Sequence, residues 1–378
     1  MFERNIFTDE QSYFRETANK FVKKEIEPYH EKWEKDGYVP KELWLKAGSI
    51  GLLCPNVPQE FGGIGGDFRF NVIVIEELAR VGATGPGFAV HSDIVSPYII
   101  NYSSKLQKNE YLPKMVKGQI ITAIAMTEPN TGSDLQNINT KAEINNDKII
   151  LNGAKTFITN GQNANLILVV AKTDLTKRAK GISIILCDDN KKGFKRGKNL
   201  KKIGMKAQDT SELYFDNVEL PLDNILGDTG QGFFQLMDEL PQERLSIAVT
   251  AISAAEAALN WTINYTKERT AFNKKIINFQ NTKFTLAKLK SEITVARTFI
   301  DKCIEEHIKN NFTAEHGAIA KLWCTDLQFK VMDECLQLFG GYGYMQEYPI
   351  ARAFLDARVQ RIYGGTNEIM KEIIGRNL

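Results

Sequence analysis

The chain is poor in the residues that build metal centres and disulfide frameworks. Its 378 residues include five cysteines, an odd number in which no Cys-x-x-Cys pair occurs. The four histidines, His30, His91, His307 and His316, are isolated from one another and lack the spacing of metal ligands. We therefore predict reduced thiols, surface or structural histidines, and no metal site.

Long apolar runs and a strong net charge are also missing. No run of about 18 apolar residues occurs, and the first residues form no apolar signal-peptide core. The formal net charge is +2, and the basic clusters between residues 191 and 202 are short, so we interpret that segment as a solvated loop. A Gly-x-Ser-x-Gly hydrolase motif is absent as well. These absences predict a cytoplasmic protein that neither spans a membrane nor binds nucleic acid.

The pattern of the sequence changes twice, which predicts three domains. Residues 1–118 show apolar positions at helical spacing, whereas residues 119–228 contain short β-branched runs separated by turns, including a hairpin turn at residues 145–147. Helical spacing returns in residues 229–378. The order of helices, then strands, then helices predicts an α+β fold.

Two helical segments carry particularly clear signals. Thr8 and Gln11 form a capping box at the start of an amphipathic segment. In the last domain, apolar residues are spaced alternately by three and four positions, as in the seam of a helix bundle. These residues are Leu286, Leu289, Ile293, Ala296, Ile300 and Cys303.

The run Pro241-Gln242-Glu243-Arg244 precedes residues 245–255, which include no charged side chain and predict a helix buried on nearly all sides. Proline is well tolerated in a first helical turn, so we place Pro241 and Glu243 there. Glu243 then has two interpretations. It is a carboxylate stabilised by the helix N-terminus beside Arg244, or it is a semi-buried catalytic base.

Three further regions are richer in polar and glycine residues than folding alone requires. Residues 124–134 follow an expected strand and can present hydroxyl and N–H groups to an anion, although an ordinary turn would look similar. Residues 155–161 place an aromatic ring and two hydroxyls at a strand end. Residues 337–344 and 361–368 contain glycine pairs, which allow a backbone to approach a phosphate closely.

These four signatures, in this order, resemble those of the flavin-dependent acyl-CoA dehydrogenases, and most closely those of the long-chain type. The resemblance covers essentially the whole chain. It implies an N-terminal helical domain, a central β-barrel-like domain and a C-terminal four-helix bundle. It also implies FAD as the cofactor and a homo-oligomer, usually a tetramer, with a cofactor site shared between subunits.

The resemblance also implies which residues contact FAD. The segment expected at the flavin ring consists of Ile124, Ala125, Met126, Thr127, Glu128, Pro129, Asn130, Thr131, Gly132 and Ser133. Phe157, Ile158 and Thr159 match the segment on the other flavin face, with phenylalanine where the family often has tryptophan. The ADP half and the pyrophosphate are expected at Arg269, Phe272, Gln280, Gln337, Leu338, Phe339, Gly340 and Gly341, and a further FAD contact at Thr366, Asn367 and Glu368.

The position of the catalytic base separates branches of this family. Many relatives carry the glutamate immediately before the tail Gly-Thr pair, where this chain has Gly364. In the long-chain and isovaleryl branches the glutamate matches Glu243, and we expect the glycine to leave room for its carboxylate. By this resemblance Glu243 takes the C2 proton while flavin N5 accepts a hydride from C3, which gives the trans-2-enoyl-CoA.

The expected substrate is an acyl-CoA, and the expected electron acceptor is an electron-transfer flavoprotein. Two alternatives remain: an acyl-CoA oxidase that uses oxygen, and a non-catalytic flavin-binding relative. Arg244 either orients and tunes the base or only pairs with a nearby acid. The residues expected along the substrate path are Ser133, Phe234, Pro241, Gln242, Glu243, Arg244, Gly364 and Gly365.

Overall fold

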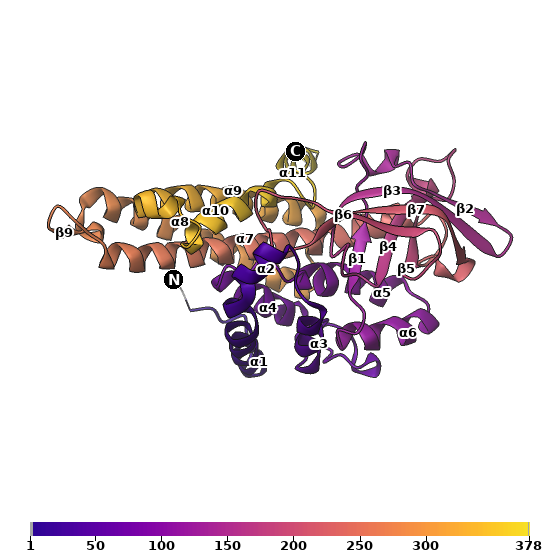
Figure 1. Ribbon diagram of the computed structural model, residues 1–378, viewed down its shortest axis with the longest axis horizontal. Helices are drawn as coiled ribbons and strands as arrows, with labels where there is room; N and C mark the ends of the chain where they lie inside the picture. The colour runs from indigo at the N-terminus through magenta and orange to yellow at the C-terminus, as the bar shows by residue number, and fades with distance from the viewer. Residues whose placement is uncertain (1–2, 377) are drawn as a thin grey trace.

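The computed structural model describes residues 3–376 and 378. Met1 and Phe2, where no signal peptide is expected, lie outside the described residues. Figure 1 shows an elongated molecule with a helix bundle at one end, a curled sheet at the other and the N-terminal helices beneath their junction. This arrangement confirms the α+β fold with helical, β and helical parts.

Helices form the first part of the chain, and the predicted capping box of Thr8 and Gln11 is present at the start of the first. The sequence did not predict the helix at residues 30–36 or the helices between residues 90 and 102. The helical elements are α1 (Asp9–Phe21), η1 (Val22–Ile26), η2 (Glu27–Tyr29), α2 (His30–Asp36), α3 (Lys41–Ser49), η3 (Gln59–Phe61), α4 (Phe68–Arg80), η4 (Val90–Val95), α5 (Ser96–Tyr102) and α6 (Lys105–Val116).

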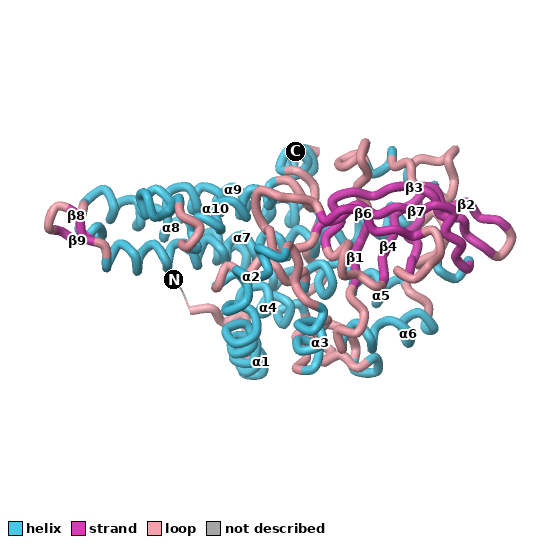
Figure 2. Tube along the Cα trace, in the orientation of Figure 1, coloured by secondary structure: helices cyan, strands magenta, loops and turns pink. Residues whose placement is uncertain are grey.

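A seven-stranded sheet forms the central part, and its strands gather at one end of the molecule in Figure 2. Its path runs β1–β4–β2–β3–β7–β6, with β5 pairing β4. The predicted hairpin is present, because Asn145 of β2 pairs with Lys148 of β3. The strands are β1 (Thr122–Ala125), β2 (Lys141–Asn145), β3 (Lys148–Thr159), β4 (Leu166–Lys172), β5 (Ile182–Asp188), β6 (Phe194–Asn199) and β7 (Thr210–Pro221).

The middle half of the basic segment predicted as a solvated loop is instead the edge strand β6, which pairs with β7. Arg196 explains why so basic a run can join the sheet. Its guanidinium donates to the carbonyls of Gly161 and Ala164 and pairs with Asp189 at 2.9 Å. Lysine and arginine side chains along an edge strand also discourage pairing with another sheet.

The C-terminal part is a bundle built around one long helix, α7 (Gly232–Glu268). It packs against α8 (Gln280–Ile308) and α9 (Ala314–Phe339), and α10 (Pro349–Ala357) packs on α9. All six seam residues predicted between 286 and 303 are buried, and no residue from 245 to 255 is exposed, as expected. The remaining elements are η5 (Leu135–Asn137), η6 (Ala179–Gly181), η7 (Leu222–Asn224), β8 (Thr270–Ala271), β9 (Lys274–Lys275), η8 (Ile276–Asn278), η9 (Gly340–Tyr344), η10 (Arg358–Arg361) and α11 (Asn367–Gly375).

A buried ionic cluster joins the N-terminal helices to the bundle. Glu76 of α4 is 2% exposed and lies within 3.1 Å of the guanidinium groups of Arg4, Arg15 and Arg297. These arginines hold the pKa of the Glu76 carboxyl below its ordinary value despite its burial. Since α4 also packs on α7, the cluster fixes the two helices that line the cavity described below.

Within the described residues, no helix is long and apolar enough to cross a membrane. The five cysteines are all buried free thiols, as predicted.

Candidate active site

The Pro241–Arg244 run lies inside α7 and not at its start. The sequence placed Pro241 in the first helical turn, which is wrong because the helix already begins at Gly232. A proline within a helix removes one backbone hydrogen bond. The neighbouring Gln242 ties this part of α7 to other elements, since its side chain donates to the carbonyl of Asp93 at 2.7 Å and accepts from Nε2 of His307 at 2.8 Å. Glu243 therefore gains no stabilisation from a helix N-terminus, which removes the first of its two interpretations.

Glu243 is a buried carboxyl group that lines a cavity. Its side chain is 5% exposed, and Tyr98 donates a hydrogen bond from Oη to its Oε1 at 3.0 Å. Burial raises the pKa of Glu243 to about 7, against the opposing effects of the Tyr98 hydrogen bond and the charge of Arg244. A carboxyl with that pKa is substantially ionised at neutral pH and can also hold a proton, as a general base requires.

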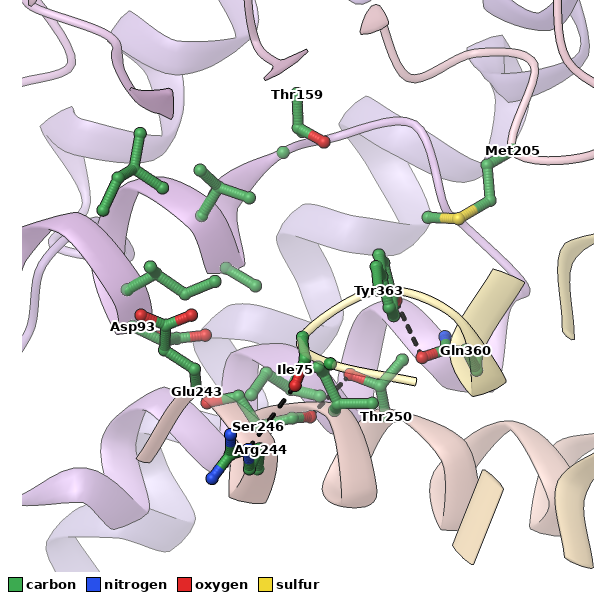
Figure 3. A pocket seen from close by; sticks show the side chains of 18 of the residues that line it. Ile75, Asp93, Thr159, Met205, Glu243, Arg244, Ser246, Thr250, Gln360 and Tyr363 are labelled. Atoms are coloured by element: carbon green, nitrogen blue, oxygen red, sulfur yellow. Dashed lines mark hydrogen bonds between the residues drawn. The ribbon is translucent and has the colours of Figure 1, made fainter. Parts of the chain in front are cut away.

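Arg244 forms no ion pair within the described residues, and its Nε donates to the carbonyl of Gly364 at 3.5 Å. Figure 3 shows Arg244 next to Glu243. Desolvation lowers the pKa of Arg244, while the charge of Glu243 raises it. Arg244 thus links the helix that carries the carboxyl to the glycine turn that packs beside it.

The Gly364-Gly365 turn needs glycine for its backbone. Both residues have positive φ angles, +64° and +88°. A Cβ at position 364 would meet Cδ1 of Ile247, so the nearest neighbour of this glycine is the isoleucine and not the carboxylate expected there. Lys321, a fully buried lysine of α9, donates from Nζ to the Gly365 carbonyl at 2.6 Å and to Oδ1 of Asn367 at 3.0 Å.

A cavity of about 530 Å³ lies among α4, η4, α7, the sheet edge and the glycine turn. Figure 3 shows Thr159 and Met205 on one side of it, with Glu243 and Arg244 on the other. Many of the residues predicted to bind cofactor or substrate line this cavity. They are Ile124, Met126, Thr127, Gly132, Ser133, Phe157, Ile158, Thr159, Glu243, Arg244, Gly364 and Gly365.

The other predicted residues of the same segments lie beside the cavity without lining it. Thr366 caps α11 through a hydrogen bond to the Ile369 N–H, and the side chain of Asn367 is held by Lys321 and Thr325. The full set is Ala125, Glu128, Pro129, Asn130, Thr131, Phe234, Pro241, Gln242, Thr366, Asn367 and Glu368.

Glu128 anchors the 124–133 segment, to which it belongs, through hydrogen bonds to neighbouring residues. Its buried carboxylate accepts hydrogen bonds from the N–H groups of Asn139 and Thr140 and from Nζ of Lys155, each within 2.9 Å. Lys155 is itself buried and also donates to the Met126 carbonyl. This ion pair shapes the turn that presents the cavity-lining residues, so the Glu128 side chain has a structural role.

Phe157 provides a test of whether the cavity fits a flat ring system. The ring is 67% exposed although the residue belongs to β3, and its φ angle is +59°. The β3–β7 register shifts between Lys155 and Ile158, so a bulge turns Phe157 toward the cavity. An exposed aromatic ring held by a strained backbone fits a planar ligand that would cover it.

A second cavity, of about 590 Å³, lies near the far end of the bundle. Figure 1 shows the β8–β9 hairpin at that end, opposite the sheet. Arg269 directly follows the end of α7, and at 1.5 Å per helical residue it lies roughly 40 Å from Glu243. This cavity includes Arg269, Gln337, Leu338, Phe339, Gly340 and Gly341, while Phe272 and Gln280 line neither cavity. The structure therefore does not bring all the predicted cofactor residues together within one chain.

Sequence reasoning missed several polar residues that line or support the first cavity. Asp93 lies in η4 and Tyr98 in α5, two elements that no sequence pattern indicated. Tyr363 donates to Oε1 of Gln360 at 2.7 Å beside the cavity (Figure 3). Lys321 is one of several charged residues of α9, and no sequence pattern distinguished it from the others.

Comparison with known proteins agrees with this geometry. Family models for the N-terminal, middle and C-terminal domains of acyl-CoA dehydrogenases match residues 8–119, 123–218 and 230–378. The chain belongs to the acyl-CoA dehydrogenase family. This protein is thus an oxidoreductase of a FAD-dependent family, and FAD is its cofactor.

Relatives support this assignment along the full chain. The mitochondrial long-chain specific acyl-CoA dehydrogenase of Rattus norvegicus is 51% identical and covers 99% of this chain and 88% of its own. An acyl-CoA dehydrogenase structure from Geobacillus kaustophilus has a TM-score of 0.97 at 46% identity, covering 99% of both chains.

Two further similar structures are of a flavoprotein and of an enzyme in complex with a flavin. A structure titled as an electron transferring flavoprotein of Acidaminococcus fermentans has a TM-score of 0.95 at 32% identity and covers 100% of this chain and 99% of its own. A glutaryl-CoA dehydrogenase from Mycobacterium smegmatis in complex with FADH2 has a TM-score of 0.92 at 28% identity, covering 98% and 95%.

Proposed function

We propose that this protein catalyses the α,β-dehydrogenation of an acyl-CoA to the trans-2-enoyl-CoA, with Glu243 as the base that removes the C2 proton. One observation carries the proposal: a single buried glutamate faces the cavity between α7 and the sheet edge, and its pKa of about 7 suits proton transfer at neutral pH. The tail position that other relatives use for the base is occupied by Gly364, which leaves Glu243 to act.

The burial of Glu243 favours the proton transfer itself. An ionised carboxylate in an apolar cavity is poorly solvated, so acceptance of a proton relieves the cost of desolvation. The Tyr98 hydroxyl limits this effect, because its hydrogen bond stabilises the ionised form and keeps part of the population deprotonated. The Tyr98 hydrogen bond thus influences which fraction of Glu243 is ionised, and therefore able to accept a proton, at neutral pH.

Arg244 and Lys321 would hold the glycine turn in place against α7. Arg244 reaches the Gly364 carbonyl, and Lys321 binds the Gly365 carbonyl and Asn367. With these carbonyls engaged, the glycine turn keeps a fixed distance from the α7 helix. A substrate thioester in the cavity would then be positioned against the base, because orientation supplies much of the rate in such reactions.

The cavity-lining part of residues 124–133, together with Phe157, Ile158 and Thr159, would hold the flavin ring, with the start of α11 nearby. When bound, FAD supplies a two-electron acceptor for the hydride that leaves C3. The acyl-CoA would pass Ser133, and Phe234, 40% exposed, would lie outside the enclosed part of the path. These assignments of individual residues are part of the proposal.

We also propose a homo-oligomer, with a tetramer as the expected form. The distal cavity at Arg269 and residues 337–341 would contact the ADP half of a neighbouring subunit's FAD. Its surroundings support this, because Phe272 is 93% exposed on the β8–β9 hairpin and Tyr344 is 82% exposed beside the glycine run. Such apolar exposure at one end of a bundle is typical of an interface.

The electron acceptor is proposed to be an electron-transfer flavoprotein, and the cytoplasmic location stays a prediction. Both follow from resemblance and not from the geometry of the cavity. An oxidase would instead turn over in air and release stoichiometric peroxide without an added acceptor.

Anaerobic bleaching of the bound flavin by acyl-CoA tests the proposed function. A series of straight and branched acyl-CoAs is expected to include substrates that bleach the flavin and to identify the preferred chain. Glu243→Gln should keep bound FAD and substrate affinity but lose the bleaching rate by several orders of magnitude, since the proton acceptor is gone. Glu239→Gln, one turn earlier on α7, is the matched control and should retain bleaching. Absence of bleaching by any acyl-CoA would refute the activity, and normal bleaching by Glu243→Gln would refute the base.

A further inference from the structure

The cavity that Glu243 lines continues well beyond this residue, as a groove between α4 and α7. One row of lining residues on α7 recurs every three, four or seven positions, which places the row on a single face of the helix. The row consists of Leu240, Glu243, Ile247, Thr250, Ala254 and Trp261. Since α4 packs against α7, its lining residues form the facing wall, and they include Val74, Ile75, Leu78 and Ala79.

This groove, which we call the acyl groove, suits a hydrocarbon chain. Both of its helical walls present mainly aliphatic side chains. The Thr250 hydroxyl on the α7 wall is already bonded within the helix, because it donates to the Ser246 carbonyl at 2.9 Å. Each methylene group buried against such walls contributes favourably to binding.

The acyl groove and the proposed flavin site lie on different sides of the cavity. Figure 3 shows Thr159 and Met205 across the cavity from Ile75 and Thr250. Thr159 belongs to the segment that we propose for the flavin ring. An acyl chain whose C2 lies at Glu243 is therefore left with the side formed by α4 and α7.

Trp261 lies at the far end of the row, where α4 has ended. Gly82, two residues after α4, also lines the cavity and has a positive φ angle of +64°, which favours glycine. A Cβ at position 82 would lie 3.2 Å from Cη2 of Trp261, so the indole packs directly over this glycine. The ring also packs against the hydrophobic core of the bundle, which fixes its position.

The separation of Glu243 and Trp261 gives the length of the groove. At 1.5 Å per residue, α7 rises about 27 Å between them. The indole and its contact distance occupy roughly one helical turn, which leaves about 22 Å. With C–C bonds of about 1.5 Å, an extended hydrocarbon chain advances about 1.3 Å per carbon, so roughly 16 carbons fit beyond C2.

We propose that Trp261, packed over Gly82, ends the acyl groove and limits straight-chain acyl-CoA substrates to about 18 carbons. The inference rests on the proposed acyl-CoA dehydrogenation and deepens it by naming long, straight acyl chains as the substrate class. Affinity should rise with chain length while added methylenes enter the groove, and it should fall once the chain meets the indole.

Calorimetric titration with S-alkyl-CoA thioethers tests the length limit separately from catalysis, because these compounds lack the carbonyl group and cannot be dehydrogenated. The FAD-loaded enzyme is titrated at concentrations below micelle formation. Affinity should rise by up to about fourfold per methylene as far as about 18 carbons and then decrease. Anaerobic flavin bleaching by acyl-CoAs of the same lengths should show the same limit.

Variants at two positions of the row should move the limit in opposite directions. Trp261→Ala removes the indole and should extend it by about four carbons, the length of one helical turn. Trp261→Phe should give a smaller extension and replaces the alanine variant if that protein does not fold. Ala254→Phe places a ring two turns closer to Glu243 and should shorten the limit to roughly ten carbons.

Trp323→Ala is the matched control for the loss of a tryptophan. Trp323 is an exposed residue of α9 that lines neither cavity, so this variant should keep the wild-type limit. Two results would overturn the inference: wild-type affinity that still rises beyond about 20 carbons, or a limit that neither the Trp261 nor the Ala254 variants move. Failure of the proposed function is a different result, in which no acyl-CoA bleaches the flavin.

Discussion

Replacement of the proposed base should stabilise the protein at alkaline pH. Burial raises the pKa of Glu243 from its ordinary value of 4.5 to about 7, so the folded state favours the protonated carboxyl. The associated stability is fully present below pH 4.5 and is lost as the pH rises through about 7. At about 1.4 kcal/mol per pKa unit, the loss reaches about 3 kcal/mol. Glu243→Gln removes the ionisation and should not lose this stability.

Urea unfolding of the apoprotein at several pH values measures this difference. At pH 5 the variant and the wild type should have similar free energies of unfolding. At pH 8 the Glu243→Gln variant should be more stable by about 3 kcal/mol. Glu268→Gln, an exposed glutamate at the end of the same helix, controls for the loss of one charge and should show no such pH dependence. A constant difference between Glu243→Gln and wild type from pH 5 to pH 8 would refute the assigned pKa and, with it, the argument for a poised base.

Three other substitutions test the supporting residues. Tyr98→Phe removes the hydrogen bond that lowers the pKa of Glu243, so the midpoint of the pH profile of flavin bleaching should rise by about one unit; an unchanged midpoint would contradict that role. Gly364→Ala forces alanine into a left-handed backbone against Ile247, so thermal unfolding should show a loss of about 1–2 kcal/mol, partly recovered by adding Ile247→Val. Lys321→Met removes the donor to the Gly365 carbonyl, at a cost of about 1–3 kcal/mol, and should release FAD more readily in a dilution assay; FAD retention equal to that of wild type would argue against this support of the glycine turn.

Local patterns in the sequence predicted the regular parts of the fold well. The Thr8 capping box and the hairpin at residues 145–147 depend on interactions between residues close in sequence, and both are present. The bundle seam from 286 to 303 depends on helical periodicity alone, and it is buried as expected. Where a tertiary interaction overrides the local signal, the predictions failed. The basic run became strand β6 because Arg196 finds carbonyl and carboxylate partners from other segments.

The active-site predictions also succeeded where the signal is in the sequence itself and failed where tertiary packing decides. Residue types and order indicated the family and the glutamate at 243, because those signatures are properties of the chain itself. The position of Pro241 within α7 could not be predicted, since tertiary packing keeps a helix continuous through a residue that locally favours a start. Tyr98 and Asp93 could not be predicted as cavity residues, because the sequences of η4 and α5 show no clear helical periodicity.

The sequence by itself determined that this is a three-part α+β member of a flavin-dependent family, and it indicated Glu243 as the base that we propose. Only the tertiary structure decided what environment that glutamate occupies. Its pKa depends on the removal of water by α4, η4 and the glycine turn, and on one hydroxyl from Tyr98, which is 145 residues away along the chain. Desolvation is a property of the surrounding packing, which no stretch of local sequence specifies.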